Sequence, residues 1–322
     1  MSRKTSSRFL SLAGLAALAA LVLPAAAAAD SVSTSADFDR WMYPFNATPG
    51  IRNLAPTFGA FDGPTFDNRD GEMIVGFDTA AAGVPSGLGS GAYEITSVTV
   101  TATHFQGDFL YDPTYDSYLT YDGSLADADA GRPIEIHGLG FRSGFSGLEL
   151  APAIPGPPGF AEDDAFAYAD PTLQGVRNVI PVDALGNDVS NNVRGGFESN
   201  PWAIGQVDGL APGDAVPEGT PGVSAGATFS FDIDLSDPMV LAYVAEGLDD
   251  GVLGFVITSL HTTTEAGGVS PNFYTGDNFD PAAIAPTIAI EYTLVPEPGT
   301  AWLLAAALAG LACVGRKRSA RI

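Results

Sequence analysis

The sequence predicts an all-β fold, a jelly-roll-like β-sandwich over residues 30–294 with one short connecting helix. β-branched and aromatic residues alternate with polar residues at period two, the pattern of a half-buried strand. These runs are separated by Gly, Pro and Asp, which favour turns. The single cysteine, Cys313, lies outside the region, so the domain relies on its core and not on disulfides.

Five segments carry the strand pattern clearly. In the second of them, Val98 and Val100 alternate with Thr99 and Thr101, which predicts an apolar inner face and a polar outer face. The expected strands, in chain order, are 72–79, 93–105, 228–235, 251–260 and 287–294.

One helix is expected at residues 239–248. Ser236 or Asp237 can cap its N-terminus, and Pro238 suits its first turn. Asp249, Asp250 and Gly251 then end it.

The segment 151–221 is rich in Pro, Gly, Asp and Asn, and its residues 155–159 read as an exposed turn or hinge. We expect a long decorated loop region within one domain. A domain boundary in this segment is the alternative.

Charge is distributed unevenly along the chain. The 322 residues include 38 acidic and 14 basic side chains, a formal net charge of −24. Residues 30–295 hold 37 of the acids against seven arginines and no lysine, a formal charge of −30. Such a domain lacks the basic face that displaces counterions from a polyanion, so we expect no nucleic-acid partner.

The N-terminus has the pattern of a secretory signal peptide, residues 1–29. Arg3, Lys4 and Arg8 precede an apolar run at 10–23, and small residues follow Pro24. We expect signal peptidase to cut near residues 29–30. A permanent membrane anchor is the alternative, but the run is shorter than the roughly 20 residues of a bilayer span.

The C-terminus, residues 295–322, has three parts in order. A Pro-Glu-Pro breaker comes first, then an apolar helical stretch at 301–314, then a basic end. The stretch is marginal for spanning a bilayer, and the basic end favours the cytoplasmic side. We therefore expect transient insertion as a transmembrane helix. The motif residues are Pro296, Glu297, Pro298, Arg316, Lys317 and Arg318.

These three parts resemble the PEP-CTERM sorting signal of Gram-negative and related bacteria. The resemblance covers about 28 residues and implies recognition by an exosortase, a membrane cysteine transpeptidase-like enzyme. Substrates in that family are exported proteins, often linked to exopolysaccharide and biofilm. An ordinary tail anchor is the alternative. The resemblance implies processing and location, not a biochemical activity.

A second, looser resemblance concerns the central domain. The opening Asp39-Arg40-Trp41, the segment 71–78 and the closing segment 288–292 are similar to the DNRLRE-type, carbohydrate-binding-like sandwiches. This resemblance supports a jelly-roll fold and does not specify a ligand.

Catalytic patterns in the sequence are weak. Ser224 sits in a G-x-S-x-G pattern, but a loop precedes it and a strand pattern follows, so we expect a turn and no nucleophile elbow. His104, His137 and His261 lack the spacing of a zinc site, and we interpret them as structural. Among 37 acids some pair always suits glycoside hydrolysis, so that pattern carries no weight. We expect no enzyme.

Calcium is the candidate cofactor. Hard oxygen ligands gather in two turns, although the same residues are common in turns without any metal. The candidate ligands are Asp67, Asp70, Glu72, Asp277 and Asp280.

Aromatic side chains offer candidate stacking platforms for sugar rings, since a tyrosine with a polar tip suits a half-exposed surface. Core packing is the alternative. The candidates are Trp41, Tyr111, Tyr115, Tyr118 and Trp202.

The leading hypothesis is therefore an exported, non-enzymatic protein of the cell envelope or extracellular matrix, associated with exopolysaccharide. A carbohydrate-binding adhesin is the second hypothesis and a polysaccharide-active enzyme the third.

Overall fold

The computed structural model describes the central domain in segments. The segments are 29–43, 51–59, 71–142, 144–150, 159–162, 164, 178–190, 192–262 and 269–295. Both apolar terminal runs predicted from the sequence lie outside them. Across these segments, no helix combines the length and the apolar character that a bilayer span requires.

The described strands form two six-stranded sheets that together make a β-sandwich, as predicted. Sheet A contains β1 (Asp30–Ser35), β14 (Thr287–Leu294), β5 (Tyr93–Gln106), β13 (Asn272–Tyr274) and β3 (Leu54–Pro56) in spatial order, with β11 (Thr228–Asp232) also paired to β5. Sheet B contains β10 (Ala203–Ile204), β6 (Ile134–Phe141), β12 (Val252–Ser259), β4 (Glu72–Asp78) and β2 (Phe38–Met42), with β9 (Val179–Val182) also paired to β6.

The chain passes back and forth between the sheets. β1, β3 and β5 belong to sheet A, whereas β2, β4 and β6 belong to sheet B. Pairing within both sheets is antiparallel. A small parallel pair, β7 (Leu148–Glu149) with β8 (Phe160–Ala161), lies outside the two sheets. This alternation between sheets agrees with the jelly-roll-like prediction.

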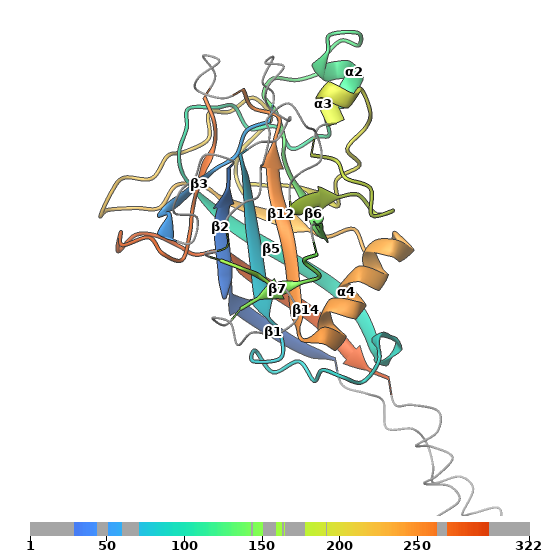
Figure 1. Ribbon diagram of the computed structural model, residues 1–322. Helices are drawn as coiled ribbons and strands as arrows, with labels where there is room; N and C mark the ends of the chain where they lie inside the picture. Colours follow the sequence, from blue (N-terminus) through green and yellow to red (C-terminus); the bar gives the residue numbers. More distant parts are fainter. Residues whose placement is uncertain are drawn as a thin grey trace, which may run out of the picture.

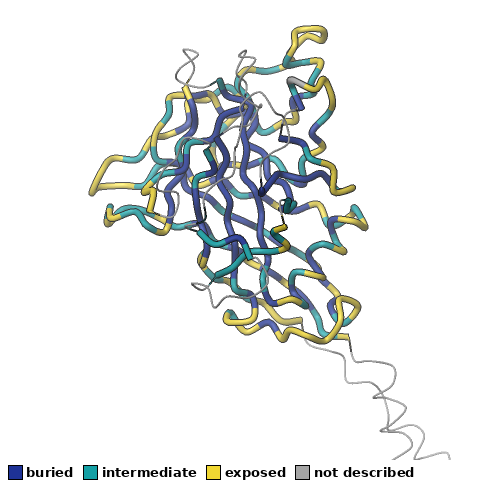
Figure 2. The backbone as a smooth tube through the Cα atoms, viewed as in Figure 1, coloured by how far each residue is buried: buried dark blue, intermediate teal, exposed yellow. Residues whose placement is uncertain are grey.

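The core lies between the sheets because the alternating strands turn their apolar faces inward. Val100 of β5, Phe231 of β11 and Ile288 of β14 are fully buried, as are Val75 of β4 and Phe255 of β12. Figure 2 shows the buried strands in the middle of the molecule and the exposed residues in the surrounding loops. The five strands expected from the sequence are therefore all present in the two sheets, three of them in sheet A and two in sheet B.

The outer face of sheet A is rich in hydroxyl groups. Thr101 of β5 bonds Thr287 of β14 (Oγ1–Oγ1 2.7 Å), and Thr99 donates to the carboxylate of Asp232 of β11 at 2.6 Å. The threonines of β5 thus pair with the neighbouring strands on the solvent side while its valines enter the core, as the alternation predicted.

The predicted helix is α4 (Pro238–Asp250), which packs on β12. Asp237 is its N-cap, with a side chain that accepts from the N–H of Met239 at 2.8 Å. Gly251 ends the helix at φ 81°, a left-handed conformation that costs glycine little. The sequence offered Ser236 or Asp237 as the N-cap, and in the structure the N-cap is Asp237.

The segment 151–221 is more regular than expected. β9 and β10 both pair with β6 and so extend sheet B, and the short helix α3 (Asn192–Gly195) lies between them. The Pro/Gly-rich composition concealed these elements because each has only two to four residues. The predicted turn at 155–159 lies outside the described residues except for Gly159.

Gly138 of β6 lets the Trp202 ring pack on the sheet. A Cβ built at Gly138 would lie 2.2 Å from Cη2 of Trp202, and this ring also makes an edge contact with Phe255. We expect Gly138→Ala to lower the free energy of unfolding by about 1–3 kcal/mol through overpacking. Denaturant unfolding followed by circular dichroism measures this change.

The matched control is Gly91→Ala in the 3-10 helix η2 (Ser90–Ala92), where the added Cβ meets no atom within 4 Å. Equal unfolding free energies for the two variants would contradict this account of the Trp202 packing.

Candidate cation site

Three carboxylates from distant parts of the chain meet at one place, which we call the Asp39 site. Asp39 belongs to β2, the edge strand of sheet B, Glu162 follows β8, and Asp277 follows β13. One carboxylate oxygen from each lies within 4.8 Å of the others.

Arg40 positions Glu162. Its side chain is fully buried, and its Nη1 donates to the carbonyl oxygens of Ala161 (3.1 Å), Glu162 (2.8 Å) and Asp164 (2.8 Å). These three bonds hold the segment 161–164 beside β2, the strand that carries Asp39. The buried guanidinium thus anchors the segment that brings Glu162 to the site.

Asp39 is 5% exposed, and its Oδ2 accepts from the N–H of Gly276 at 2.7 Å. Its own N–H donates to Oε1 of Glu162 at 3.1 Å. Burial is the main factor that raises the pKa of Asp39 to about 7, and the nearby charges of Glu162 and Asp277 add to it, against the opposing Gly276 bond. The site therefore has an excess of negative charge.

This arrangement suits a hard divalent cation. Calcium binds oxygen at roughly 2.3–2.6 Å, so two oxygens on one ion are at most about 5 Å apart. The three carboxylate oxygens satisfy that limit. Asp39, Glu162 and Asp277 are the residues that could hold such an ion.

Of the five calcium ligands predicted from the sequence, only Asp277 belongs to this site. Glu72 is buried within β4, and the carboxylate of Asp280 accepts backbone N–H groups of Gly222 and Ala282. Asp67 and Asp70 lie outside the described residues. Asp277 and Asp280, expected together in one turn, therefore differ in role, since the carboxylate of Asp280 accepts backbone N–H groups and only Asp277 belongs to the Asp39 site.

The sequence did not indicate Asp39 and Glu162 as candidate ligands. They are 123 positions apart, and no spacing rule links them. The only trace in the sequence is that Asp39 and Arg40 interrupt the otherwise apolar β2.

The predicted stacking residues divide into buried and surface groups. Tyr111 and Trp202 are 3% and 4% exposed, so their rings belong to the core and cannot stack on a sugar. Trp41 stacks on Tyr43 with ring centroids 4.6 Å apart. Tyr115, in contrast, is 38% exposed.

Tyr115 and Tyr118 are held by one acid. The Tyr115 hydroxyl and the Tyr118 N–H both donate to Oε2 of Glu198, at 2.6 and 3.1 Å. Tyr118 begins the short helix α2 (Tyr118–Tyr121), which contacts α3. The five candidates therefore do not form a single aromatic platform.

A groove of about 540 Å³ lies beside β5 and β11. It offers hydroxyls and one carboxylate but no aromatic ring. Its lining comprises Thr101, Gln206, Val207, Asp208, Leu210, Pro217, Ala225, Gly226, Ala227, Thr228 and Ser230.

The three histidines are buried, and each is engaged in local contacts. Nδ1 of His104 is 3.2 Å from the carbonyl oxygen of Pro217, and Nε2 of His137 is 3.2 Å from Oε2 of Glu135. Burial, the Arg132 charge and His104 lower the pKa of His261 to about 3, which makes it a poor general base near neutral pH.

Ser224 lies in a turn, as predicted. Its N–H donates to the carbonyl of Thr220, whose own N–H donates back to the Ser224 carbonyl, and β11 follows at Thr228. A nucleophile elbow needs a helix after the serine, and here a strand follows.

The six sorting-motif residues all lie outside the described residues. No protein-family model matches the chain, and a search of curated proteins finds no match.

Proposed function

We propose that this is an exported, non-enzymatic protein of the cell envelope or extracellular matrix, sorted through its Pro-Glu-Pro tail and associated with exopolysaccharide. The signal peptide pattern and the tail are two of its supports. The third is the acidic domain, whose formal charge of −30 favours solubility and association with divalent cations among acidic polymers.

The observation that carries the proposal is the placement of the two ends of the domain. β1 pairs antiparallel with β14, so Asp30 lies opposite Tyr292. The N–H of Val295 then donates to the carbonyl of Ala92 at 2.9 Å. Both ends of the described domain thus lie at one pole, while α2 and α3 lie at the opposite pole (Figure 1).

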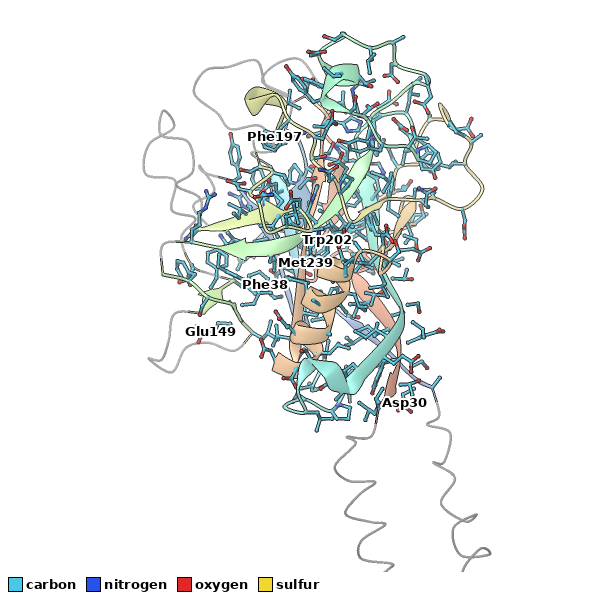
Figure 3. All side chains as sticks on the ribbon, turned by 90° about the vertical axis from the view of Figure 1, so that its right-hand side faces the viewer. Asp30, Phe38, Glu149, Phe197, Trp202 and Met239 are labelled. Atoms are coloured by element: carbon cyan, nitrogen blue, oxygen red, sulfur yellow. The ribbon has the colours of Figure 1, made fainter. Side chains whose placement is uncertain are left out.

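Figure 3 shows the same arrangement from the side, with Asp30 at one end and Phe197, just after α3, near the other. A domain held by its C-terminal tail would therefore turn its α2–α3 pole away from the membrane. We call this end the distal pole.

Replacing the breaker, Pro296, Glu297 and Pro298, with three alanines is expected to block processing, because the tail would lose the feature that distinguishes it from a plain anchor. The variant should accumulate in the membrane fraction of the native host, whereas the unmodified protein reaches the envelope or medium. Immunoblots of cell fractions measure this.

The matched control is Thr300→Ala, which changes a residue beside the breaker and should fractionate as the unmodified chain does. If the triple-alanine variant is also processed and distributed normally, the sorting proposal fails.

A further inference from the structure

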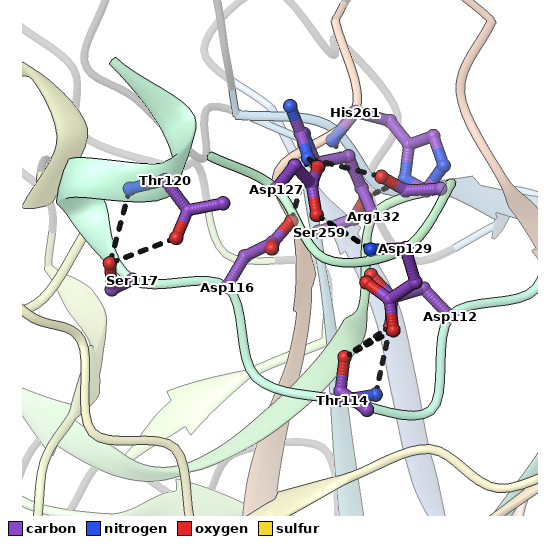
Figure 4. A network of polar contacts seen from close by, with 11 residues as sticks. Asp112, Thr114, Asp116, Ser117, Thr120, Asp127, Asp129, Arg132, Ser259 and His261 are labelled. Carbon is purple, nitrogen blue, oxygen red and sulfur yellow. Dashed lines mark hydrogen bonds and ion pairs between the residues drawn. The ribbon is translucent and has the colours of Figure 1, made fainter. Parts of the chain in front are cut away.

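Four carboxylates lie in two loop segments at the distal pole, and two of them bond one guanidinium (Figure 4). Nη1 of Arg132 donates to Oδ2 of Asp116 at 2.8 Å and to Oδ2 of Asp127 at 2.6 Å. Asp112 and Asp129 complete the group from the same two loop segments, and both lie within bonding distance of Thr114 Oγ1. When all four acids are ionised, the cluster has three negative charges more than Arg132 neutralises.

One carboxylate oxygen of Asp112 is buried and accepts no hydrogen bond from the described residues. Its residue is 2% exposed, and Oδ1 accepts from both the N–H and Oγ1 of Thr114 at 2.8 Å. Its other oxygen, Oδ2, is buried and has no hydrogen-bond partner among the described residues. A buried carboxylate oxygen without a donor or a cation is costly.

Thr114 cannot satisfy both neighbouring acids. Its Oγ1 is 2.8 Å from Oδ1 of Asp112 and 3.0 Å from Oδ2 of Asp129, but a hydroxyl has one hydrogen to donate. One of the two contacts is therefore between two oxygen acceptors unless one of the carboxyl groups carries a proton, and a cation bound to the carboxylates would offset the repulsion.

We propose that Asp112 and Asp129 bind a divalent cation at the distal pole, with calcium preferred. Both are hard oxygen ligands, and calcium accepts the irregular geometry that loop ligands provide. A cation there would be a partner for Oδ2 of Asp112 and would offset the repulsion between the neighbouring carboxylates.

The loop is built to bring these two acids together. Gly131 has φ 120°, and a Cβ there would lie 2.8 Å from the carbonyl oxygen of Leu110, so only glycine permits this approach of the two segments. The site involves neither the sorting tail nor the Asp39 site.

The test uses the mature protein, stripped of metal with a chelator and titrated with calcium chloride by calorimetry. We expect Asp112→Asn and Asp129→Asn each to weaken one calcium-binding event by about tenfold or more, by loss of a ligand. In metal-free protein we expect Asp112→Asn to raise Tm, because it removes an uncompensated buried charge.

Asp129 is half-buried, so its variant tests the site without disturbing the core. The matched control is Asp108→Asn, an exposed acid of the same loop, which should leave calcium binding unchanged. Terbium provides a second readout, since Tyr121 lies 5.7 Å from the Arg132 guanidinium and should sensitise its luminescence in a manner lost with Asp129→Asn.

Unchanged calcium affinity in both cluster variants would overturn the proposal. So would loss of all calcium binding in Asp39→Asn alone, which would assign the ion to the Asp39 site. Neither result would affect the sorting proposal.

Discussion

Arg40→Ala is expected to lower the free energy of unfolding by about 3–5 kcal/mol, a typical cost of removing one member of a buried charged network. The fully buried side chain donates to three carbonyl oxygens in the segment 161–164. Its guanidinium carbon also lies 4.7 Å from the ring centroid of Phe160. Alanine would leave those carbonyls without this donor and a cavity beside the ring.

Equilibrium denaturant unfolding measures the effect, and Arg40→Met separates its causes, because methionine fills part of the space without donating hydrogen bonds. The matched control is Arg142→Ala. Arg142 forms a part-exposed ion pair with Asp188 at 2.8 Å, and such pairs contribute roughly 0–1 kcal/mol. If Arg40→Ala were no more destabilising than Arg142→Ala, the anchoring of Glu162 at the Asp39 site would lose its basis.

Acidification should destabilise the domain through His261. This ring is buried at the distal pole, beside Ser259, Arg132 and His104, and its pKa is lowered to about 3 from the ordinary 6.5. Between these values the unfolded chain binds a proton that the folded domain does not. The contribution of His261 is therefore complete above pH 6.5 and declines as the pH falls towards 3, by roughly 4–5 kcal/mol in total.

The neighbouring acids act in the opposite direction. Asp116, paired with Arg132, has its pKa raised to about 6, so the folded state gains its proton before the unfolded chain does. The test therefore compares two proteins. Between pH 6.5 and 4, the slope of unfolding free energy against pH should be smaller in His261→Gln than in the unmodified protein. Ser259→Ala should keep the original slope, since burial is the main cause of the shift. Identical slopes in His261→Gln and the unmodified protein would refute this assignment.

The centre of the fold is predictable because its strands obey simple alternation. β5, β11 and β14 place β-branched and aromatic residues inward and threonines or acids outward, so period two is visible. Alternation does not predict β6. Glu135 and His137 are both fully buried on its outer side, and Gly138 makes room for Trp202, so polar and glycine residues occupy positions that the pattern assigns to solvent or turns.

The candidate sites were less predictable than the fold because they depend on contacts between distant segments. Asp277 was recognisable as an acid in a turn, but nothing in the sequence joins it to Asp39. The proposed distal site depends on Asp112, whose burial only the fold reveals.

The central claim is that the acidic domain is exported and sorted through its tail. The most direct measurement is the intact mass of the protein purified from its native host with and without the sorting enzyme. We predict a mature chain that begins near Asp30 in both strains and that loses the segment 301–322 only when the enzyme is present. A chain that retains 301–322 in both strains would contradict the claim.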